Sequence, residues 1–414
     1  MAEVEAAAGE RRGPADCEAG LGGASAPAAT FGRGRRTLGR RFHDALHGNP
    51  TLAPLLVLAL SCAIFGLIAP NFFSPFNLSL IIQQVTIIGL LGAAQTLVIL
   101  TAGIDLSVAA IMVLSYMVMA RLGVEAGLPS LFAVMVGLGV GLACGLFNGS
   151  LVTRLRPLPV LLAAALWFGL IQLGVPVLWA VPVGVFAALA LIAGSVRAPA
   201  LDAGFPLRLP PFIATLGAWS IFFALNLWYA QAQTVRSQDL DASAPFLKFF
   251  GERVGLFGAQ LTYGSFLMLA VFVALWYALS WTAWGRSVYA VGDDKDAAEL
   301  SGIRTDRVLM SVYGLAGFLC ALAGWAAIGR VGSAAPQAFY EGNLDAITAV
   351  VIGGTSLFGG RGVIFGTLIG ALIVGVFRSG LALSGVDVLW QTFAVGLLII
   401  VAVAMDQWIR RVTA

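Results

Sequence analysis

Two acidic residues stand inside otherwise apolar stretches, where a carboxylate can do chemistry that a surface carboxylate cannot. Asp105 lies in TAGIDLS, and Asp345 lies in EGNLDAIT. A carboxylate within a membrane can couple transport to an ion or a proton. An Asp beside a helix break can instead cap the next helix, and we favour this interpretation because a proton-driven carrier usually needs more buried ionisable groups. Three nearby glycines mark candidate helix breaks or gates: Gly103, Gly353 and Gly354.

The sequence motifs of enzyme active sites are missing. A phosphate-binding GxxxxGK[ST] loop needs a lysine after glycine, but the two lysines follow Leu247 and Asp294. His43 and His47 are four residues apart, which can place two metal ligands on one helix face. With no cysteine or third ligand nearby, we interpret them as a solvated or headgroup-level pair. We therefore predict no catalytic residue, no metal site and no cofactor in this chain.

A hydrophilic stretch of mixed charge, TAWGRSVYAVGDDKDAAELSGIRTDR (282–307), separates two long apolar runs. Asp293 or Asp294 can cap a short helix over 295–300, and Gly302 is placed to end it. The residues before this helix look strand-like or irregular. A short helix held between two membrane spans can dock on a partner; an ordinary cytoplasmic loop is the alternative.

The composition is that of a membrane protein. Hydrophobic residues make up 59% of the chain and charged residues 11%, and the mean hydropathy is +0.92. A soluble domain has roughly a quarter charged residues. Residues 1–50 lack an apolar period and predict a disordered, basic cytoplasmic tail against anionic lipid, with a twin-arginine export signal as the alternative. Its basic cluster consists of Arg33, Arg35, Arg36, Arg40 and Arg41.

Apolar runs follow one another through residues 51–414 and predict an all-α, polytopic bundle of about ten to twelve transmembrane helices. With the N-terminus inside, most of the 24 Lys and Arg residues fall on the inner side. This bias predicts cytoplasmic N- and C-termini, a cytoplasmic 282–307 loop, and a 231–261 segment on the opposite side. The expected spans are 52–69, 78–100, 106–120, 130–152, 158–174, 176–195, 211–230, 262–281, 308–328, 344–358, 363–378 and 388–408.

Repeated small residues predict how these helices pack. Glycines recur every four residues over 137–149 and again over 362–370, a spacing that lets helix backbones approach closely. A weak internal similarity also relates LTAGIDLS (100–107) to VIGGTSLF (351–358). Each of these stretches ends a predicted span on the inner side, and internal repeats are common in transporters.

Longer motifs point to a family. The sequence contains TLVILTAGIDLSVAAIM (96–112), GLFNGSLVTRLR (145–156), PPFIATLG (210–217), TAWGRSVYAVGDDKDAAELSGIRTDRV (282–308) and LDAITAVVIGGTSLFGGRGVIFGTLIGALIVG (344–375). Over most of residues 50–410 it resembles the membrane permease subunit of bacterial monosaccharide ABC importers, the ribose/xylose/fructose group. NLWYAQAQTVRSQDLDASAPFLKFFG (226–251) is most similar to the fructose type.

The resemblance implies an inner-membrane permease that imports a monosaccharide by alternating access, fructose first and otherwise ribose, mannose or xylose. It implies a permease homodimer, a separate ABC ATPase that binds ATP and Mg²⁺, a periplasmic sugar-binding protein, surrounding membrane lipid, and no nucleic acid. It also implies that 282–307 is the cytoplasmic coupling loop. Its ATPase-contacting or loop-shaping positions would be Gly285, Arg286, Gly292, Ala297, Ala298, Glu299, Gly302 and Ile303.

One departure and two alternatives accompany this interpretation. In such permeases GLFNGSLVTRLR runs almost directly into PPFIATLG, whereas here residues 157–209 intervene. Their two apolar runs predict an inserted, peripheral helical hairpin that keeps the later topology. One alternative function is a permease of the same fold for another small solute, such as a branched-chain amino acid or a purine nucleoside. The other is an ion-coupled secondary carrier that depends on Asp105 or Asp345.

Overall fold

The computed structural model describes residues 51–153, 169, 172–197, 208–256 and 258–413. All of them belong to one compact unit, Asn49–Ala414. The predicted tail over 1–50 and most of the predicted 158–174 span lie outside the described residues.

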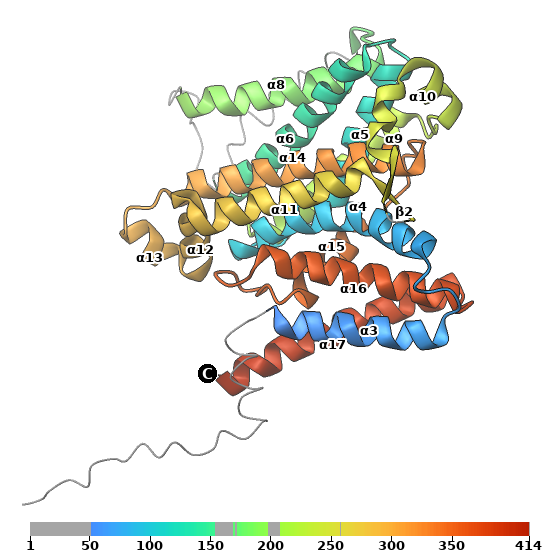
Figure 1. Cartoon of the computed structure of the whole chain (residues 1–414). Coiled ribbons are helices and arrows are strands. Elements are labelled where there is room, and N and C mark those ends of the chain that lie inside the picture. The colour runs from blue at the N-terminus through green and yellow to red at the C-terminus, as the bar shows by residue number, and fades with distance from the viewer. Residues whose placement is uncertain (1–50, 154–168, 170–171, 198–207, 257, 414) are drawn as a thin grey trace, which may run out of the picture. The chain divides into compact units, whose positions relative to one another are not determined.

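The described chain is a bundle of long helices that run roughly parallel to one another (Figure 1). This confirms the predicted all-α, polytopic architecture. A helix rises about 1.5 Å per residue, so about 20 apolar residues cross a bilayer. Six of the described helices are long and apolar enough: α4 (Pro75–Leu100), α6 (Ser130–Thr153), α9 (Pro211–Ala230), α11 (Tyr263–Trp281), α14 (Thr305–Val331) and α16 (Ile364–Leu383).

Five further helices carry shorter apolar stretches of 10–17 described residues. Each of these apolar stretches is shorter than 18 residues over the part that is described, so the prediction of ten to twelve crossings stays a prediction. The predicted span 344–358 was too long: its helix ends at Ile352, because Gly354 turns the chain with a left-handed φ of +83°. The five are α3 (Leu52–Ile68), α5 (Val108–Val124), α8 (Val177–Arg197), α15 (Gly342–Ile352) and α17 (Val388–Thr413).

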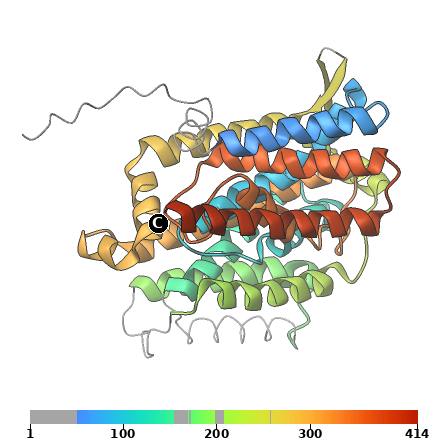
Figure 2. The same ribbon diagram turned by 90° about the horizontal axis from the view of Figure 1, so that it is seen from below.

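Smaller elements gather at the two ends of the bundle, in both views (Figures 1 and 2). The helices α12 (Ala283–Asp293) and α13 (Lys295–Leu300) stand at one end. The other end carries α10 (Ser237–Ser243), a 3₁₀ helix η2 (Pro245–Gly251) and an antiparallel hairpin of β1 (Arg253–Leu256) with β2 (Ala259–Thr262). The predicted opposition of the 282–307 loop and the 231–261 segment is therefore confirmed.

The predicted glycine packing is confirmed where α6 meets α14 at the centre of the bundle. A Cβ on Gly145 would overlap the carbonyl oxygen of Tyr313, and one on Gly317 would overlap that of Gly141. No side chain fits between these two backbones, so the helices touch directly. On the outer side of α6, α8 packs through the buried residues Ala180 and Val181. One helix of the predicted 157–209 hairpin is thus described, at the periphery.

Candidate functional site

A sharp turn leads from α11 into α12. Thr282 caps α12, because its Oγ1 accepts a 3.1 Å hydrogen bond from the N–H of Gly285. A Cβ on Gly285 would overlap the carbonyl oxygen of Leu279. Only glycine therefore fits at this corner, which gives the predicted position Gly285 a loop-shaping role.

The second helix of the loop has the caps that its sequence predicts. The Asp294 side chain accepts hydrogen bonds from two N–H groups at 2.9 Å each, those of Asp296 and Ala297. At the other end Gly302 has a φ of +85° and donates to the carbonyl of Glu299 at 3.0 Å. The N–H of Ile303 donates to the carbonyl of Ala298, also at 3.0 Å, which completes a Schellman cap.

The residues before α13 are helical, so the prediction of a strand-like or irregular piece was wrong. Val288 and Val291 lie three residues apart and are both buried, so one face of α12 packs onto the bundle. This burial, together with the Thr282 cap, favours the helix. The four buried residues, Gly285, Val288, Val291 and Gly292, recur at helical spacing, so the sequence offered a signal that the prediction did not use.

The two faces of α13 differ in exposure. Ala298 is only 4% exposed and packs inward, whereas Leu300 on the outer face is 91% exposed. Ala297 and Arg286 are also exposed, so these two predicted positions are accessible to a partner, and Ala298 is not. Leu300 was not among the predicted contacts, although a large apolar residue in an otherwise hydrophilic segment was a visible signal.

Glu299 holds α13 against its neighbours. Its Oε1 accepts a 2.5 Å hydrogen bond from the Thr305 hydroxyl at the start of α14. The same oxygen lies 3.8 Å from Nη1 of Arg208, which precedes α9, and Nη2 of Arg208 lies 3.6 Å from Asp306. Glu299 is therefore a positioning residue for α13 as well as an exposed charge.

The C-terminal end of α12 contacts two irregular segments at once. We name residues 100–107, which comprise the last residue of α4 and the segment that leads to α5, the first break, and residues 353–363, between α15 and α16, the second break. A Cβ on Gly292 would overlap the carbonyl oxygen of Leu100, and that oxygen also accepts a 3.0 Å hydrogen bond from the N–H of Gly360. The two stretches with internal sequence similarity thus meet at Gly292.

A side chain of α12 strengthens this junction. The Tyr289 hydroxyl donates a 2.9 Å hydrogen bond to the carbonyl of Gly362 in the second break. Burial raises the pKa of the Tyr289 phenol, so it stays protonated and able to donate. Any displacement of α12 therefore acts directly on both breaks.

The predicted role of Asp105 as N-cap is corrected by the structure, which places Ser107 at that position of α5. Asp105 is 1% exposed and forms an Asx turn two residues earlier. Its Oδ1 accepts hydrogen bonds from the N–H and the hydroxyl of Ser107, both at 2.7 Å. Its Oδ2 accepts one from Asn148 of α6 at 3.3 Å.

Asp345 is not an N-cap either, because Glu341 occupies that position and Asp345 lies inside the first turn of α15. Its Oδ1 is 2.6 Å from Nη2 of Arg378 on α16. An ion pair in this low-dielectric setting joins the two helices and neutralises the carboxylate. The sequence offered no signal for this pair, because the partners are 33 residues apart on different helices.

The three predicted break glycines have structural roles. A Cβ on Gly103 would lie 2.9 Å from the Tyr313 hydroxyl, and one on Gly353 would overlap the carbonyl of Gly366 on α16. Gly354 adopts the left-handed turn that ends α15. Each permits a close approach or a turn, and a gating role for them stays a prediction.

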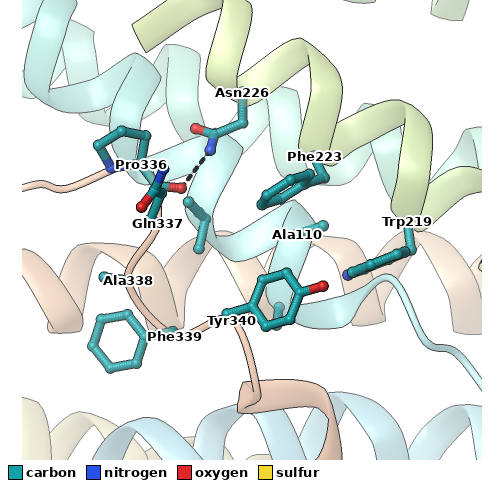
Figure 3. Close-up of a pocket in the computed structure, with 11 residues that line it drawn as sticks. Ala110, Trp219, Phe223, Asn226, Pro336, Gln337, Ala338, Phe339 and Tyr340 are labelled. Carbon is teal, nitrogen blue, oxygen red and sulfur yellow. Dashed lines mark hydrogen bonds between the residues drawn. The ribbon is translucent and has the colours of Figure 1, made fainter. Parts of the chain in front are cut away.

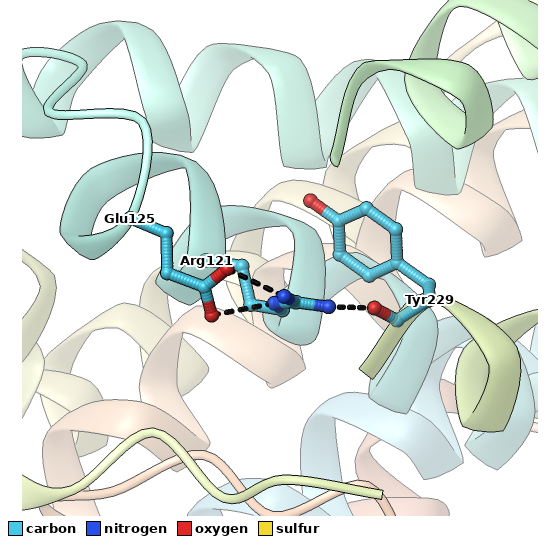
Figure 4. Close-up of polar contacts among 3 residues, drawn as sticks. All are labelled: Arg121, Glu125 and Tyr229. Atoms are coloured by element: carbon cyan, nitrogen blue, oxygen red, sulfur yellow. Dashed lines mark hydrogen bonds and ion pairs between the residues drawn. The ribbon is translucent and has the colours of Figure 1, made fainter. Parts of the chain in front are cut away.

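Far from α12, a buried arginine fastens α5 to α9 (Figure 4). Arg121 is 6% exposed, and its guanidinium donates to both oxygens of Glu125 and to the backbone carbonyl of Tyr229. The guanidinium carbon also lies 5.3 Å from the centre of the Tyr229 ring. The spacing of four residues between Arg121 and Glu125 was the signal that the sequence offered for this pair.

Comparisons with known proteins agree on one family. Residues 157–403 match the family model described as branched-chain amino acid transport system / permease component. The chain is 47% identical to the fructose import permease protein of Rhizobium meliloti over 395 residues, 95% of each chain. It is 35% identical to the ribose import permease protein of Bacillus subtilis over 86% of this chain and 92% of that one. It is 33% identical to the D-allose transport system permease protein of Escherichia coli, over 86% and 91%.

No solved structure is significantly similar to the chain. The family match covers more than half of the sequence, and the relatives are aligned over almost their whole length. The apolar helices identify a multi-pass membrane protein. The chain therefore belongs to this family of transport-system permease components.

Proposed function

We propose that this chain is the membrane subunit of an ATP-driven ABC importer that moves a monosaccharide, fructose first, across the inner membrane by alternating access. The observation that carries the proposal is the 47% identity to a fructose import permease over 95% of both chains. The relatives named for ribose and D-allose support the wider class of monosaccharides.

In this proposal α12 and α13 form the coupling site for a separate ATPase, which binds ATP and Mg²⁺. The exposed Leu300 and Ala297 offer a small apolar surface that fits a groove, and Arg286 adds charge beside it. Closure of the ATPase would displace α12. Since Gly292 touches Leu100 and Tyr289 bonds to Gly362, that displacement reaches both breaks.

The opposite end is the proposed docking surface for a periplasmic sugar-binding protein. It carries α10, η2 and the β hairpin, which project from the bundle away from α12 (Figure 1). The Lys and Arg bias supports cytoplasmic termini and a cytoplasmic α12–α13 loop. Two copies of this chain would enclose the pathway, and lipid would cover exposed apolar residues such as Leu60 and Leu67 of α3.

The test is uptake of labelled fructose, ribose, mannose and xylose by membrane vesicles. The vesicles would contain this chain, its ATPase and its binding protein, and the control vesicles would lack one component each. We expect ATP-dependent uptake of one sugar only when all three are present. Uptake by this chain alone that an uncoupler abolishes would instead support an ion-coupled carrier and contradict the proposal.

A second solute class is favoured by the family description, which names branched-chain amino acids. Labelled leucine, isoleucine and valine in the same vesicles, with the same binding protein, separate the two classes. Sugar uptake that excess leucine does not reduce supports the monosaccharide.

A further inference from the structure

Irregular backbone enters the bundle between α14 and α15. The helix α15 has 11 residues and so is about 16 Å long, roughly half of the hydrocarbon thickness. A Cβ on its first residue, Gly342, would contact Leu91, which lies about 14 Å before the end of α4. The segment 332–341 therefore descends to about the middle of the membrane. Non-helical backbone at that depth occurs where protein buries it or where it lines a water-filled cavity.

The segment is held in a strained shape by its neighbours. Asn226 of α9 donates a 2.8 Å hydrogen bond to the carbonyl of Pro336, and the Tyr116 hydroxyl of α5 donates to that of Ala335. Ala334 pairs with Val235 through backbone bonds of 2.9 and 3.0 Å. Within this restrained segment Phe339 has a φ of +58°, a backbone conformation that is unfavourable for a bulky residue. The fold thus enforces one conformation on this segment.

A pocket lies between this segment, α5 and α9 (Figure 3). It is a shallow depression and no enclosed cavity, because the space of about 290 Å³ that it spans includes open solvent. Tyr340 meets Trp219 and Phe223 edge to face, with ring centroids 5.8 and 5.6 Å apart. Two amides also line the pocket: Gln337 is exposed, and Asn226 is 1% exposed. Oδ1 of Asn226 accepts no hydrogen bond from the described residues.

The chemistry of this lining matches a neutral sugar. A monosaccharide has apolar C–H faces, which pack on aromatic rings, and a rim of hydroxyls, which bond to amides and carbonyls. None of the 11 lining residues is charged. A branched-chain amino acid would bring an ammonium and a carboxylate into the pocket, and neither would find a countercharge there.

We propose that this pocket is a transit site for a neutral monosaccharide, in which Trp219, Phe223 and Tyr340 contact the sugar ring and Gln337 its hydroxyls. This inference rests on the proposed function and adds the residues that would select the solute class. The site is shallow and open to solvent, as a transit site must be if the solute is to leave it.

The test measures sugar transported per ATP hydrolysed in vesicles that hold the complete importer with labelled fructose, ribose, mannose or xylose. We expect Tyr340→Ala and Trp219→Ala to lower this ratio about three- to tenfold, because each removes one aromatic contact. Tyr340→Phe keeps the ring and is expected to stay within about twofold of the unchanged protein. The matched control is Tyr277→Ala on α11, since Tyr277 is 61% exposed and Tyr340 is 55% exposed.

The possible failures are distinguishable. If the unchanged importer takes up no sugar, the proposed function fails before any variant is compared. If it does, and both alanine variants keep its ratio, the transit site is refuted. If the alanine variants change the association of two permease copies but leave the sugar transported per ATP unchanged, the pocket is a contact between subunits. That result also refutes the transit site. If Trp219→Ala does not fold, Gln337→Ala takes its place in the test, because Gln337 is exposed and its substitution should not disturb the fold. We expect Gln337→Ala to lower the sugar transported per ATP about twofold.

Discussion

The two breaks contact the same glycine but are held in different ways. The first break is fastened by side chains of other helices: Asn148 of α6 bonds to Asp105, and Thr215 of α9 bonds to the backbone of Ile104 and Leu106 at 3.0 and 3.2 Å. The second break is held mostly through backbone groups and receives one side-chain bond named above, from Tyr289 of α12. Its Ser356 N–H donates to the carbonyl of Arg361 at 2.9 Å, and three of its glycines adopt a left-handed φ. Those glycines are Gly354, Gly359 and Gly360.

This difference gives the two breaks unequal resistance to displacement. Displacing the first break disrupts several buried side-chain hydrogen bonds, each with a net value of about 0.5–1.5 kcal/mol. The second break can change shape with fewer such losses, because glycine has wide conformational freedom. We infer that the first break is the anchor between α12 and α9, and that the second is the hinge that lets α16 shift.

The largest expected effect comes from removing the junction that both breaks share. Gly292→Val places a side chain where the carbonyl of Leu100 lies, so α12 separates from both breaks. We expect ATP-dependent uptake to fall by more than about tenfold while the protein still inserts and binds its ATPase. The control is Gly217→Ala, since a Cβ there meets no atom within 4 Å. Normal uptake by Gly292→Val would disprove direct transmission through this contact.

The second prediction concerns the first break alone. Asp105→Ala removes three buried hydrogen bonds, and we expect it to lower the free energy of unfolding by about 1–3 kcal/mol. Asp105→Asn keeps an acceptor oxygen, so we expect it to lower the free energy of unfolding by less than half of that amount. Thermal unfolding in detergent measures both, with the exposed Ser220→Ala as control. If Asp105→Asn lowers the free energy of unfolding as much as Asp105→Ala does, the charge of Asp105 contributes to stability, and the ion-coupled interpretation gains support.

The third prediction concerns the second break. Gly360→Ala and Gly385→Ala both put alanine at a left-handed φ, +68° and +75°, and each should lose about 1–2 kcal/mol of stability. Only Gly360 lies against α12, where a Cβ would be 2.8 Å from the Cα of Asp293. We therefore expect Gly360→Ala to reduce sugar transported per ATP and Gly385→Ala to leave it unchanged. Equal effects would show that strain alone is responsible.

The smallest effect is expected for the neutral substitution Glu299→Gln, because Glu299 bonds to the start of α14 and to Arg208. Glu299→Gln keeps an acceptor for Thr305 but loses the attraction to Arg208, an exposed pair with a value of about 0–1 kcal/mol. We expect uptake to fall less than about twofold. Glu299→Arg loses the acceptor and repels Arg208, so it should uncouple ATP hydrolysis from uptake. Coupled uptake by Glu299→Arg would remove Glu299 from the coupling site.

Much of the fold was predictable because helix length and helix ends depend on nearby residues. The spans 211–230 and 262–281 match α9 and α11 to within one residue, and the Asp294 cap and Gly302 stop follow from short-range hydrogen bonds. Pairwise contacts were not predictable in this way. The pairing of Asp345 with Arg378, and the seat of Gly292 on Leu100, depend on how whole helices pack.

By itself, the sequence determined a membrane-embedded helical protein, the caps of α13, and the family to which the chain belongs. Hydropathy, periodicity and capping are decided within a few residues, so they can be read locally. Only the tertiary structure showed that two distant breaks meet at Gly292 and that Trp219 and Tyr340 line one pocket. These contacts join residues far apart in the chain, and close packing of the entire bundle selects which surfaces meet.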